Sequence, residues 1–308
     1  MSVNQQKPIW IKQLPLAAGI GLLLLPLLLY ARQHLLRPVR TNLEMTLFQG
    51  ITYKRQARNT PRPYMLHIVS IDLTASGIGV LVTPGNSQAG DNTLDASKEI
   101  QARTTSEFVS EFKLQLAINA GYFFPFREHT PWDFYPRSGE RVNVVGQAIA
   151  NGSTYSGVQS GRPVLCFNSG NRAQIFDSGQ CPTETVHAVA GSHIVLKRGV
   201  LSLSPESSRQ DKPYSRVAVA IDRQGQKLWL IVIDGKQPLY SEGVTLGELS
   251  EIAQELGAFE ALNLDGGGSA TLVVANDSGV KVLNAPIHTK VPMRQRPVAN
   301  HLGFFADF

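Results

Sequence analysis

Short runs of apolar residues, bounded by turn residues, recur along the chain from about residue 63 and predict β-strands. Residues 64–73 and 78–83 are two such runs. Residues 216–221 and 227–234 are two more, and a turn-forming Asp-Arg-Gln-Gly sequence separates them, so they are expected to form a hairpin. No internal repeat interrupts this pattern, which favours one domain in this part of the chain.

Two capping boxes interrupt the strand pattern and predict helices. Thr104 is followed three residues later by Glu107, and Thr245 by Glu248, so each hydroxyl and carboxylate can satisfy the other's free backbone N–H. The first box predicts a helix that ends near residue 112. The second opens a run of apolar residues at helical spacing, and Gly257 is a natural end for that helix.

The second helix lies between two predicted strands, residues 227–234 and 259–265, and this order predicts a strand–helix–strand crossover. We expect the two strands to be parallel neighbours about 5 Å apart. Asp234 and Asp265 would then end their strands at the same edge of the sheet and share one cleft. The expected fold is α+β, with a mixed β-sheet core, flanking helices and this one βαβ crossover.

The N-terminal region differs from the rest of the chain. Residues 14–30 carry no charge, are rich in leucine and have basic residues on both sides, which favours a single transmembrane anchor that precedes the folded domain. A cleaved signal peptide is the alternative, although the small residues usual before a cleavage site are poorly matched. The expected organisation is a polar tail (1–13), the anchor or signal segment (14–31), a basic linker (32–62) and one folded domain (63–308).

Composition and charge agree with this division. The hydrophobic content of 43% and the charged content of 17% exclude global disorder. Nine of the 29 basic residues but only one of the 24 acidic residues lie in residues 1–62, so the remainder carries a net charge of about −3. The basic arm suits anionic lipid, and no nucleic-acid partner is expected for the domain. We expect a membrane-anchored protein with its domain on the extracytoplasmic side, in the periplasm or outside the cell.

The chain has two cysteines, Cys166 and Cys181, and turn-forming residues fill the segment between them. Export by the N-terminal segment favours a disulfide that closes this loop, and two unrelated buried thiols are the alternative.

The most informative segment for chemistry is Leu-Asn-Leu-Asp-Gly-Gly-Gly-Ser-Ala-Thr-Leu at residues 262–272. Asp265 ends an apolar run, and three glycines then leave the backbone uncovered and free to adopt unusual dihedrals. Bare N–H groups in such a turn can bind an anion. A flexible turn between two strands is the alternative, although a simple hairpin seldom needs three glycines.

Other candidate residues are ambiguous when each is taken alone. Asp234 is a second carboxylate beside Asp265 or only a turn residue, and the pair would suit glycoside cleavage. Asn119 ends a strand and would donate to a ligand or cap the strand. Arg216 and Arg296 would clamp a phosphate or lie on the surface. No cofactor or metal site is expected, and a divalent cation held by carboxylates is the open alternative.

A loop rich in aromatic residues follows Asn119. It contains Phe123, Phe124, Phe126 and Trp132 together with charged residues. Such a loop is either a buried loop core or a lid that stacks on sugar rings, and the sequence does not separate the two.

Several of these segments occur in an order that resembles the phosphodiester glycosidase family. The segments are Asn119–Phe123, Arg216–Ile221, Val232–Gly235, Gly243–Leu246, Asn263–Thr271 and Arg296–Asn300. The resemblance covers roughly residues 100–306, and bacterial members are often described as related to exopolysaccharide. Ala270 stands where the family often has Ser or Thr, which is a mild departure.

The resemblance implies a hydrolase that cleaves the bond between a sugar's anomeric carbon and a phosphodiester in cell-envelope or exopolysaccharide glycans. A non-catalytic binder of polysaccharide or peptidoglycan and a phosphodiesterase that cuts P–O are the alternatives. Asp265 is expected as the principal acid or base, with Asp234 second. The expected binding residues are Arg296, Arg216, Gly266, Gly267 and Gly268 for phosphate, Asn119 and Ser269 for the sugar, and Asn300.

Overall fold

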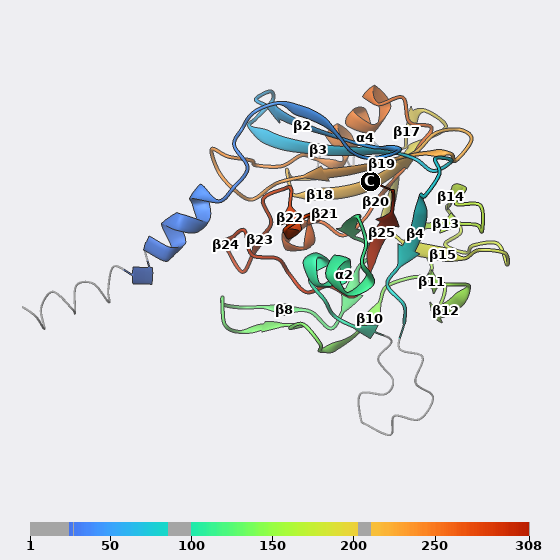
Figure 1. Cartoon of the computed structure of the whole chain (residues 1–308), viewed down its shortest axis with the longest axis horizontal. Helices are drawn as coiled ribbons and strands as arrows, with labels where there is room; N and C mark the ends of the chain where they lie inside the picture. The colour runs from blue at the N-terminus through green and yellow to red at the C-terminus, as the bar shows by residue number, and fades with distance from the viewer. Residues whose placement is uncertain (1–24, 27, 86–99, 203–210, 308) are drawn as a thin grey trace, which may run out of the picture.

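The computed structural model describes residues 25–26, 28–85, 100–202 and 211–307 (Figure 1). Three larger sheets and two short helices make up most of it. The largest sheet has eight strands, and every pairing within it is antiparallel. In spatial order its strands are β1 (Leu43–Phe48), β2 (Ile51–Arg58), β3 (Tyr64–Asp72), β19 (Lys227–Ile233), β18 (Arg216–Ile221), β20 (Glu260–Asn263), β16 (His193–Lys197) and β17 (Val200–Leu201).

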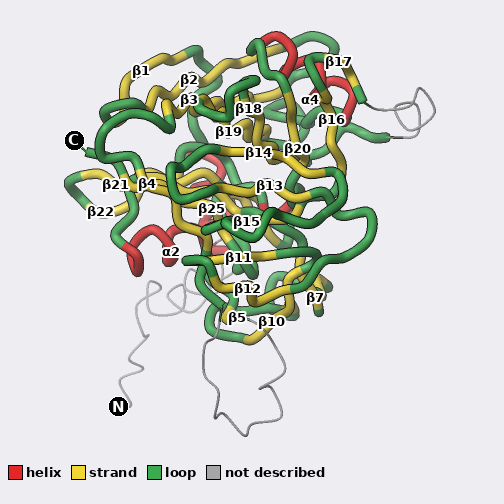
Figure 2. The backbone as a smooth tube through the Cα atoms, turned by 90° about the vertical axis from the view of Figure 1, so that its right-hand side faces the viewer, coloured by secondary structure: helices red, strands yellow, loops and turns green. Residues whose placement is uncertain are grey.

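Two five-stranded sheets pack beneath the large sheet, as the view in Figure 2 shows. One contains β22 (Gly279–Val282), β21 (Leu272–Asn276), β6 (Leu116–Asn119), β25 (His301–Phe305) and β4 (Gly79–Val82). The other contains β12 (Ser153–Ser156), β11 (Ala148–Ala150), β15 (His187–Ala190), β13 (Val164–Phe167) and β14 (Ala173–Phe176).

Smaller strand groups extend one end of the molecule and carry the loops around the site. They are β5 (Ile100–Gln101), β10 (Arg141–Val144) and β7 (Phe123–Phe124); the pair β8 (Arg127–Glu128) and β9 (Phe134–Tyr135); and the pair β23 (Ile287–His288) and β24 (Val291–Pro292).

Alternating side chains on the strands divide the apolar residues into layers. One face of the large sheet carries residues such as Val219 and Leu230. These share the main core with Ile118 and Leu302, which belong to the five-stranded sheet that contains β6 and β25. The opposite face of the large sheet packs on helix α4 (Leu246–Glu255). Helix α2 (Thr105–Phe112) covers the far side of the sheet that contains β6 and β25 (Figure 1). The predicted α+β character is confirmed by these layers.

Both predicted capping boxes are present and begin the two helices. Thr104 accepts the backbone N–H of Glu107, and the Glu107 carboxylate accepts the N–H of Thr104. Thr245 and Glu248 make the same reciprocal pair at α4. The hairpin of β18 and β19 also forms as predicted.

The strand–helix–strand unit differs from the prediction in one respect. Strands β19 and β20 run in the same direction, but β18 lies between them and is antiparallel to both. Asp234 and Asp265 therefore end at the same edge of the sheet about 10 Å apart, two strand spacings rather than one. The expectation of neighbouring parallel strands was wrong because hydrophobic periodicity carries no information on strand order.

Part of the expected basic linker is folded into the sheet. Strand β2 pairs with β3 along its whole length, and β1 continues the sheet beyond it. The preceding residues also contact the domain, since the Tyr240 hydroxyl donates to the carbonyl of Pro38 at 2.8 Å. The folded unit therefore begins before residue 63.

The predicted anchor, residues 14–31, lies mostly outside the described residues. Within the described part of the chain, no helix combines the length and the apolar character needed to cross a membrane. Residues 28–35 are helical and project from the domain in Figure 1.

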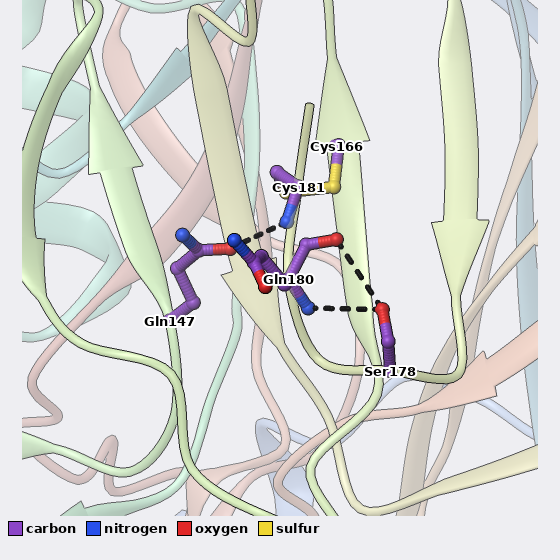
Figure 3. Close-up of a disulfide and its surroundings, with 5 residues drawn as sticks. All are labelled: Gln147, Cys166, Ser178, Gln180 and Cys181. Atoms are coloured by element: carbon purple, nitrogen blue, oxygen red, sulfur yellow. Dashed lines mark hydrogen bonds between the residues drawn. A yellow bond between two sulfur atoms is a disulfide. The ribbon is translucent and has the colours of Figure 1, made fainter. Parts of the chain in front are cut away.

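The predicted disulfide between Cys166 and Cys181 is present (Figure 3). It joins β13 to the segment after β14, and the Cys181 N–H donates to the side-chain oxygen of Gln147 at 2.7 Å. Both cysteines belong to an apolar cluster with Ile149 and Val164.

Replacing both cysteines by serine is expected to lower the free energy of unfolding by about 3 kcal/mol, because the bridge closes a loop with a sequence separation of 15. Urea unfolding of the full chain and of the Cys166→Ser/Cys181→Ser variant would measure the difference. Equal unfolding midpoints, or free thiols titrated in the unreduced protein, would contradict the prediction.

Candidate active site

The glycine-rich segment connects the large sheet to the five-stranded sheet that contains β21 and β6. It leaves β20, turns through the short 3-10 helix η1 (Gly267–Ser269) and enters β21. Backbone hydrogen bonds fasten it to β18 and to the residue after β6: Leu264 N–H donates to the carbonyl of Val217 at 2.8 Å, and Asp265 N–H donates to the carbonyl of Ala120 at 2.9 Å. Asp265 is therefore placed where two sheets meet.

Asn119, at the end of β6, holds both ends of this crossing. Its side-chain Nδ2 donates to the carbonyl of Asp265 at 2.6 Å, and its Oδ1 accepts the N–H of Thr271 at 3.0 Å. Asn119 is buried, so the structure places its amide against backbone rather than in a cavity. Asn300 is also buried, and its Oδ1 accepts the N–H of Gly121 at 2.8 Å.

Each of the three glycines meets a different neighbour. A Cβ at Gly266 would lie 2.3 Å from the carbonyl oxygen of Ser215, and one at Gly268 would lie 2.3 Å from Nη2 of Arg296. Gly267 has a φ of +62°, and a Cβ added there would lie 2.7 Å from the ring of Tyr214. The glycines therefore serve close packing, and the Gly267 N–H already donates to Ser215 at 2.9 Å rather than standing open to an anion.

A cavity of about 250 Å³ opens beside this segment. It brings together residues that are far apart in the sequence, and its walls are Tyr122, Phe123, Phe126, Tyr214, Arg216, Asp265, Gly266 and Arg296. Its size and its mixture of aromatic and charged walls suit a small polar ligand with an anionic group.

Asp265 lines the cavity and has an unusual environment. Burial raises the pKa of its carboxyl group to about 6, while a hydrogen bond from the Ser269 side chain and the positive charge of Arg296 oppose that rise. The backbone N–H of Gly266 also donates to the carboxylate. The group can therefore change its protonation state near neutral pH, as an acid or base must.

Arg296 is buried and held on every side. Its Nε donates to Nδ1 of His288 at 3.2 Å, its Nη1 donates to the Ser269 hydroxyl at 3.1 Å, and its Nη2 donates to the Glu128 carboxylate. Burial, and then the charge of Arg296, lower the pKa of His288 to about 3, so the imidazole is neutral and can accept. Ser269 is buried beneath the cavity and links Arg296 to Asp265.

Arg216 lines the same cavity from β18. Its Nη2 donates to both carboxylate oxygens of Asp211, at 2.6 and 2.8 Å, and its Nε donates to the carbonyl of Val244 at 3.2 Å. The side chain of Arg216 is thus fixed in place beside Tyr214, over whose ring its guanidinium lies at 5.7 Å.

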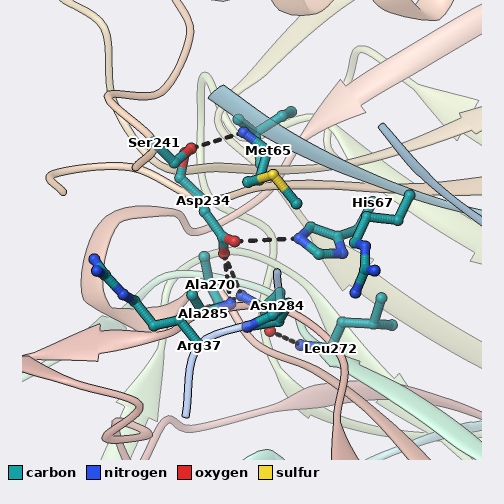
Figure 4. A network of polar contacts seen from close by, with 12 residues as sticks. Arg37, Met65, His67, Asp234, Ser241, Ala270, Leu272, Asn284 and Ala285 are labelled. Atoms are coloured by element: carbon teal, nitrogen blue, oxygen red, sulfur yellow. Dashed lines mark hydrogen bonds and ion pairs between the residues drawn. The ribbon is translucent and has the colours of Figure 1, made fainter. Parts of the chain in front are cut away.

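Asp234 does not line the cavity. It is fully buried in a separate polar network, where its carboxylate accepts from Asn284 Nδ2 and from the N–H of Ala285, both at 2.9 Å (Figure 4). Its other oxygen lies 3.1 Å from Nε2 of His67, whose Nδ1 bonds the Tyr53 hydroxyl. The expected pairing with Asp265 in one cleft is corrected by this geometry, because every oxygen of Asp234 already has a protein partner.

The sequence interpretation missed Tyr122, Tyr214, Glu128 and His288. Tyr122 lies within the Asn119–Phe123 segment that had been singled out, so a signal for it existed. Glu128 and His288 come from short hairpins whose approach to Arg296 no local pattern predicts.

Two residues of the aromatic loop, Phe123 and Phe126, line the cavity, and Phe126 lies under the Arg296 guanidinium at 4.5 Å. Trp132 does not line this cavity and is 80% exposed. Within the described residues, no group of three or more His, Cys, Asp or Glu is arranged to hold a metal ion.

Known proteins resemble this chain in sequence pattern and in fold. A family model described as "Phosphodiester glycosidase" matches residues 112–305, which include every cavity residue. No curated protein matches the chain.

Three solved structures share the fold. The first is a hypothetical protein from Synechocystis (TM-score 0.62, 15% identity); the match covers 86% of this chain and 64% of that one. The second is the zebrafish N-acetylglucosamine-1-phosphodiester alpha-N-acetylglucosaminidase catalytic domain, auto-inhibited by its pro-peptide (TM-score 0.55, 18% identity), with 90% and 92% covered. The third is a putative exported protein from Burkholderia pseudomallei (TM-score 0.58, 12% identity), with 87% and 97% covered.

A Gly268→Ala substitution is expected to disable anion binding in the cavity, because the new methyl would lie 2.3 Å from Nη2 of Arg296 and displace the guanidinium. Titration of the full chain with inorganic phosphate, followed by calorimetry, should show at least a roughly tenfold weaker Kd, the loss of about one charge-assisted hydrogen bond. Gly157→Ala is the matched control, since nothing lies within 4 Å of its added Cβ. Equal phosphate affinity in both variants would show that Arg296 is not the anion-binding group.

Proposed function

Because the chain belongs to the phosphodiester glycosidase family and is therefore a hydrolytic enzyme, we propose that it cleaves a glycosyl-1-phosphodiester between the sugar C1 and the phosphate oxygen. One observation carries this proposal most directly. Asp265 and Arg296 face one cavity and are joined through Ser269, so an acid–base group and an anion-binding group lie side by side.

In this proposal the sugar lies in the 250 Å³ cavity and its phosphate lies against Arg296. Tyr122, Phe123 and Phe126 supply aromatic faces for the apolar side of a sugar ring. Arg216 adds a second positive charge to the cavity lining. The zebrafish structure carries in its name an activity on a sugar 1-phosphodiester, which supports this class of substrate.

Asp265 acts in its ionised form. A phosphate monoester leaves readily, so protonation of the leaving group contributes little, and positive charge develops at the sugar C1 as the bond breaks. A carboxylate beside C1 stabilises that charge and takes a proton from the attacking water. Asn119 serves as a positioning residue, because it fixes the carbonyl of Asp265 rather than contacting sugar.

The proposed setting is the outside of a membrane, on a cell-envelope or exopolysaccharide glycan. The leucine-rich N-terminal segment and the Cys166–Cys181 disulfide both suit an exported, oxidising environment. One structurally similar protein is described as a putative exported protein, which agrees with this setting.

Asp265→Asn is expected to lower kcat on a glycosyl phosphodiester by about 10²–10⁴-fold, the usual contribution of an acid–base group. Folding should be retained or improved, since the folded state no longer has to ionise a buried carboxyl. Asp234→Asn is the control. Its amide oxygen can still accept from Asn284 and Ala285, so kcat should change only a few-fold. Equal losses of kcat in the two variants would refute the distinction between these carboxylates.

The same assay, run in water labelled with heavy oxygen, identifies which bond is cleaved. Mass spectrometry should find the label in the released sugar, because water attacks C1. Label in the phosphate product would instead assign P–O cleavage and overturn the proposed bond.

The pH dependence of kcat/KM follows from the raised pKa of Asp265. The folded pKa of about 6 lies above the ordinary value of 3.8, so the carboxyl is largely protonated below pH 6 and ionised above it. Activity that needs the carboxylate should rise as the pH increases through about 6 and then level off. A profile that falls through pH 6 would assign Asp265 as a general acid instead.

A further inference from the structure

A second and larger hollow lies next to the catalytic cavity. Its volume is about 1060 Å³, and six of its twelve lining residues have apolar or aromatic side chains. These six are Pro26, Tyr30, Pro131, Trp132, Ile287 and Val291. We call this hollow the outer groove. It is far larger than a monosaccharide needs, and nothing in the proposed reaction at Asp265 uses it.

The outer groove begins at the phosphate end of the catalytic cavity. Glu128 lines the groove, and its carboxylate accepts from Arg296, which lines the cavity. The same carboxylate accepts the N–H of Thr289 at 2.6 Å, and Thr289 also lines the groove. His288, between the groove residues Ile287 and Thr289, accepts from Arg296 as well. The two spaces therefore adjoin at Arg296 and Glu128.

The groups of the proposed substrate occur in the same order as the catalytic cavity, Arg296 and the outer groove. A glycosyl phosphodiester consists of a sugar, a phosphate and a second substituent on that phosphate. With the sugar at Asp265 and the phosphate at Arg296, the second substituent must leave the cavity beside Arg296. We propose that the outer groove binds this substituent and that it is an apolar chain, so that the substrate is a lipid-linked glycosyl phosphodiester; this inference rests on the proposed function.

The charge of the groove supports an apolar chain on an anionic linkage. Its two cations, Lys236 and Lys290, are exposed at the surface, and its single carboxylate, Glu128, is already paired with Arg296. A chain of methylenes would cover Trp132, which is 80% exposed, and the two lysines at the surface would face the anionic linkage. Pro26 and Tyr30 lie at the C-terminal end of the leucine-rich stretch, residues 14–30, so this wall of the groove is formed by the segment expected to meet lipid.

The test compares two substrates that differ only in chain length. The full chain is assayed with methyl and octyl diesters of one sugar 1-phosphate, the octyl compound being kept below its micelle concentration. We expect kcat/KM for the octyl diester to be at least about tenfold higher, a gain that burial of two methylenes supplies. Equal values for the two diesters would overturn the outer groove as a chain site and leave the proposed function intact. Turnover of neither diester would overturn the proposed function itself.

Variants locate the effect in the outer groove. Trp132→Ala and Val291→Thr should each reduce the octyl preference by about threefold or more while leaving turnover of the methyl diester unchanged. Val200→Thr is the control, because Val200 is a strand valine that lies outside the groove; it is exposed, whereas Val291 is half-buried. A preference for octyl that survives both groove substitutions would show that the chain binds elsewhere.

Discussion

The crossing of the chain from one sheet to another at residues 264–272 is the constraint on which the site depends. Two buried asparagines hold it. Asn119 bonds the carbonyl of Asp265 and the N–H of Thr271, while Asn284 bonds the carbonyl of Ala270 and the N–H of Leu272. Backbone groups that would otherwise be buried without partners are satisfied in this way, and an unsatisfied group would cost roughly 1–3 kcal/mol. These bonds fix the backbone of Asp265, and its carboxylate is held in turn by the Ser269 hydroxyl and the Gly266 N–H.

Local features of this fold could be predicted from the sequence, whereas the arrangement of strands could not. The Thr104 and Thr245 capping boxes depend only on residues three apart, so both were predicted and both form. The position of β18 between β19 and β20 depends on which strands meet in space, and hydrophobic periodicity does not encode that. Glu128 was missed for the same reason, because its partner Arg296 lies 168 residues away.

Arg296 shows how the site is organised before any ligand arrives. Its guanidinium is held by His288, Ser269 and Glu128, so little side-chain entropy remains to be lost when an anion binds. An arginine that is 7% exposed needs such partners, since a buried unpaired charge is costly. Glu128 has a second partner, because its other oxygen accepts the N–H of Thr289, and this bond would remain in the proposed phosphate complex.

Asp234 and Asp265 lie at the same edge of a sheet but have different roles. Asp234 is the more deeply buried, yet Asn284, Ala285 and His67 surround it with partners, so it behaves as a structural anchor that ties the large sheet to the segment after β22. Asp265 has fewer donors and faces a cavity, and burial raises its pKa. A carboxylate whose oxygens all accept hydrogen bonds from protein groups is poorly placed to act as an acid or base. The proposed chemistry is therefore assigned to Asp265, the carboxylate whose desolvation remains partly uncompensated.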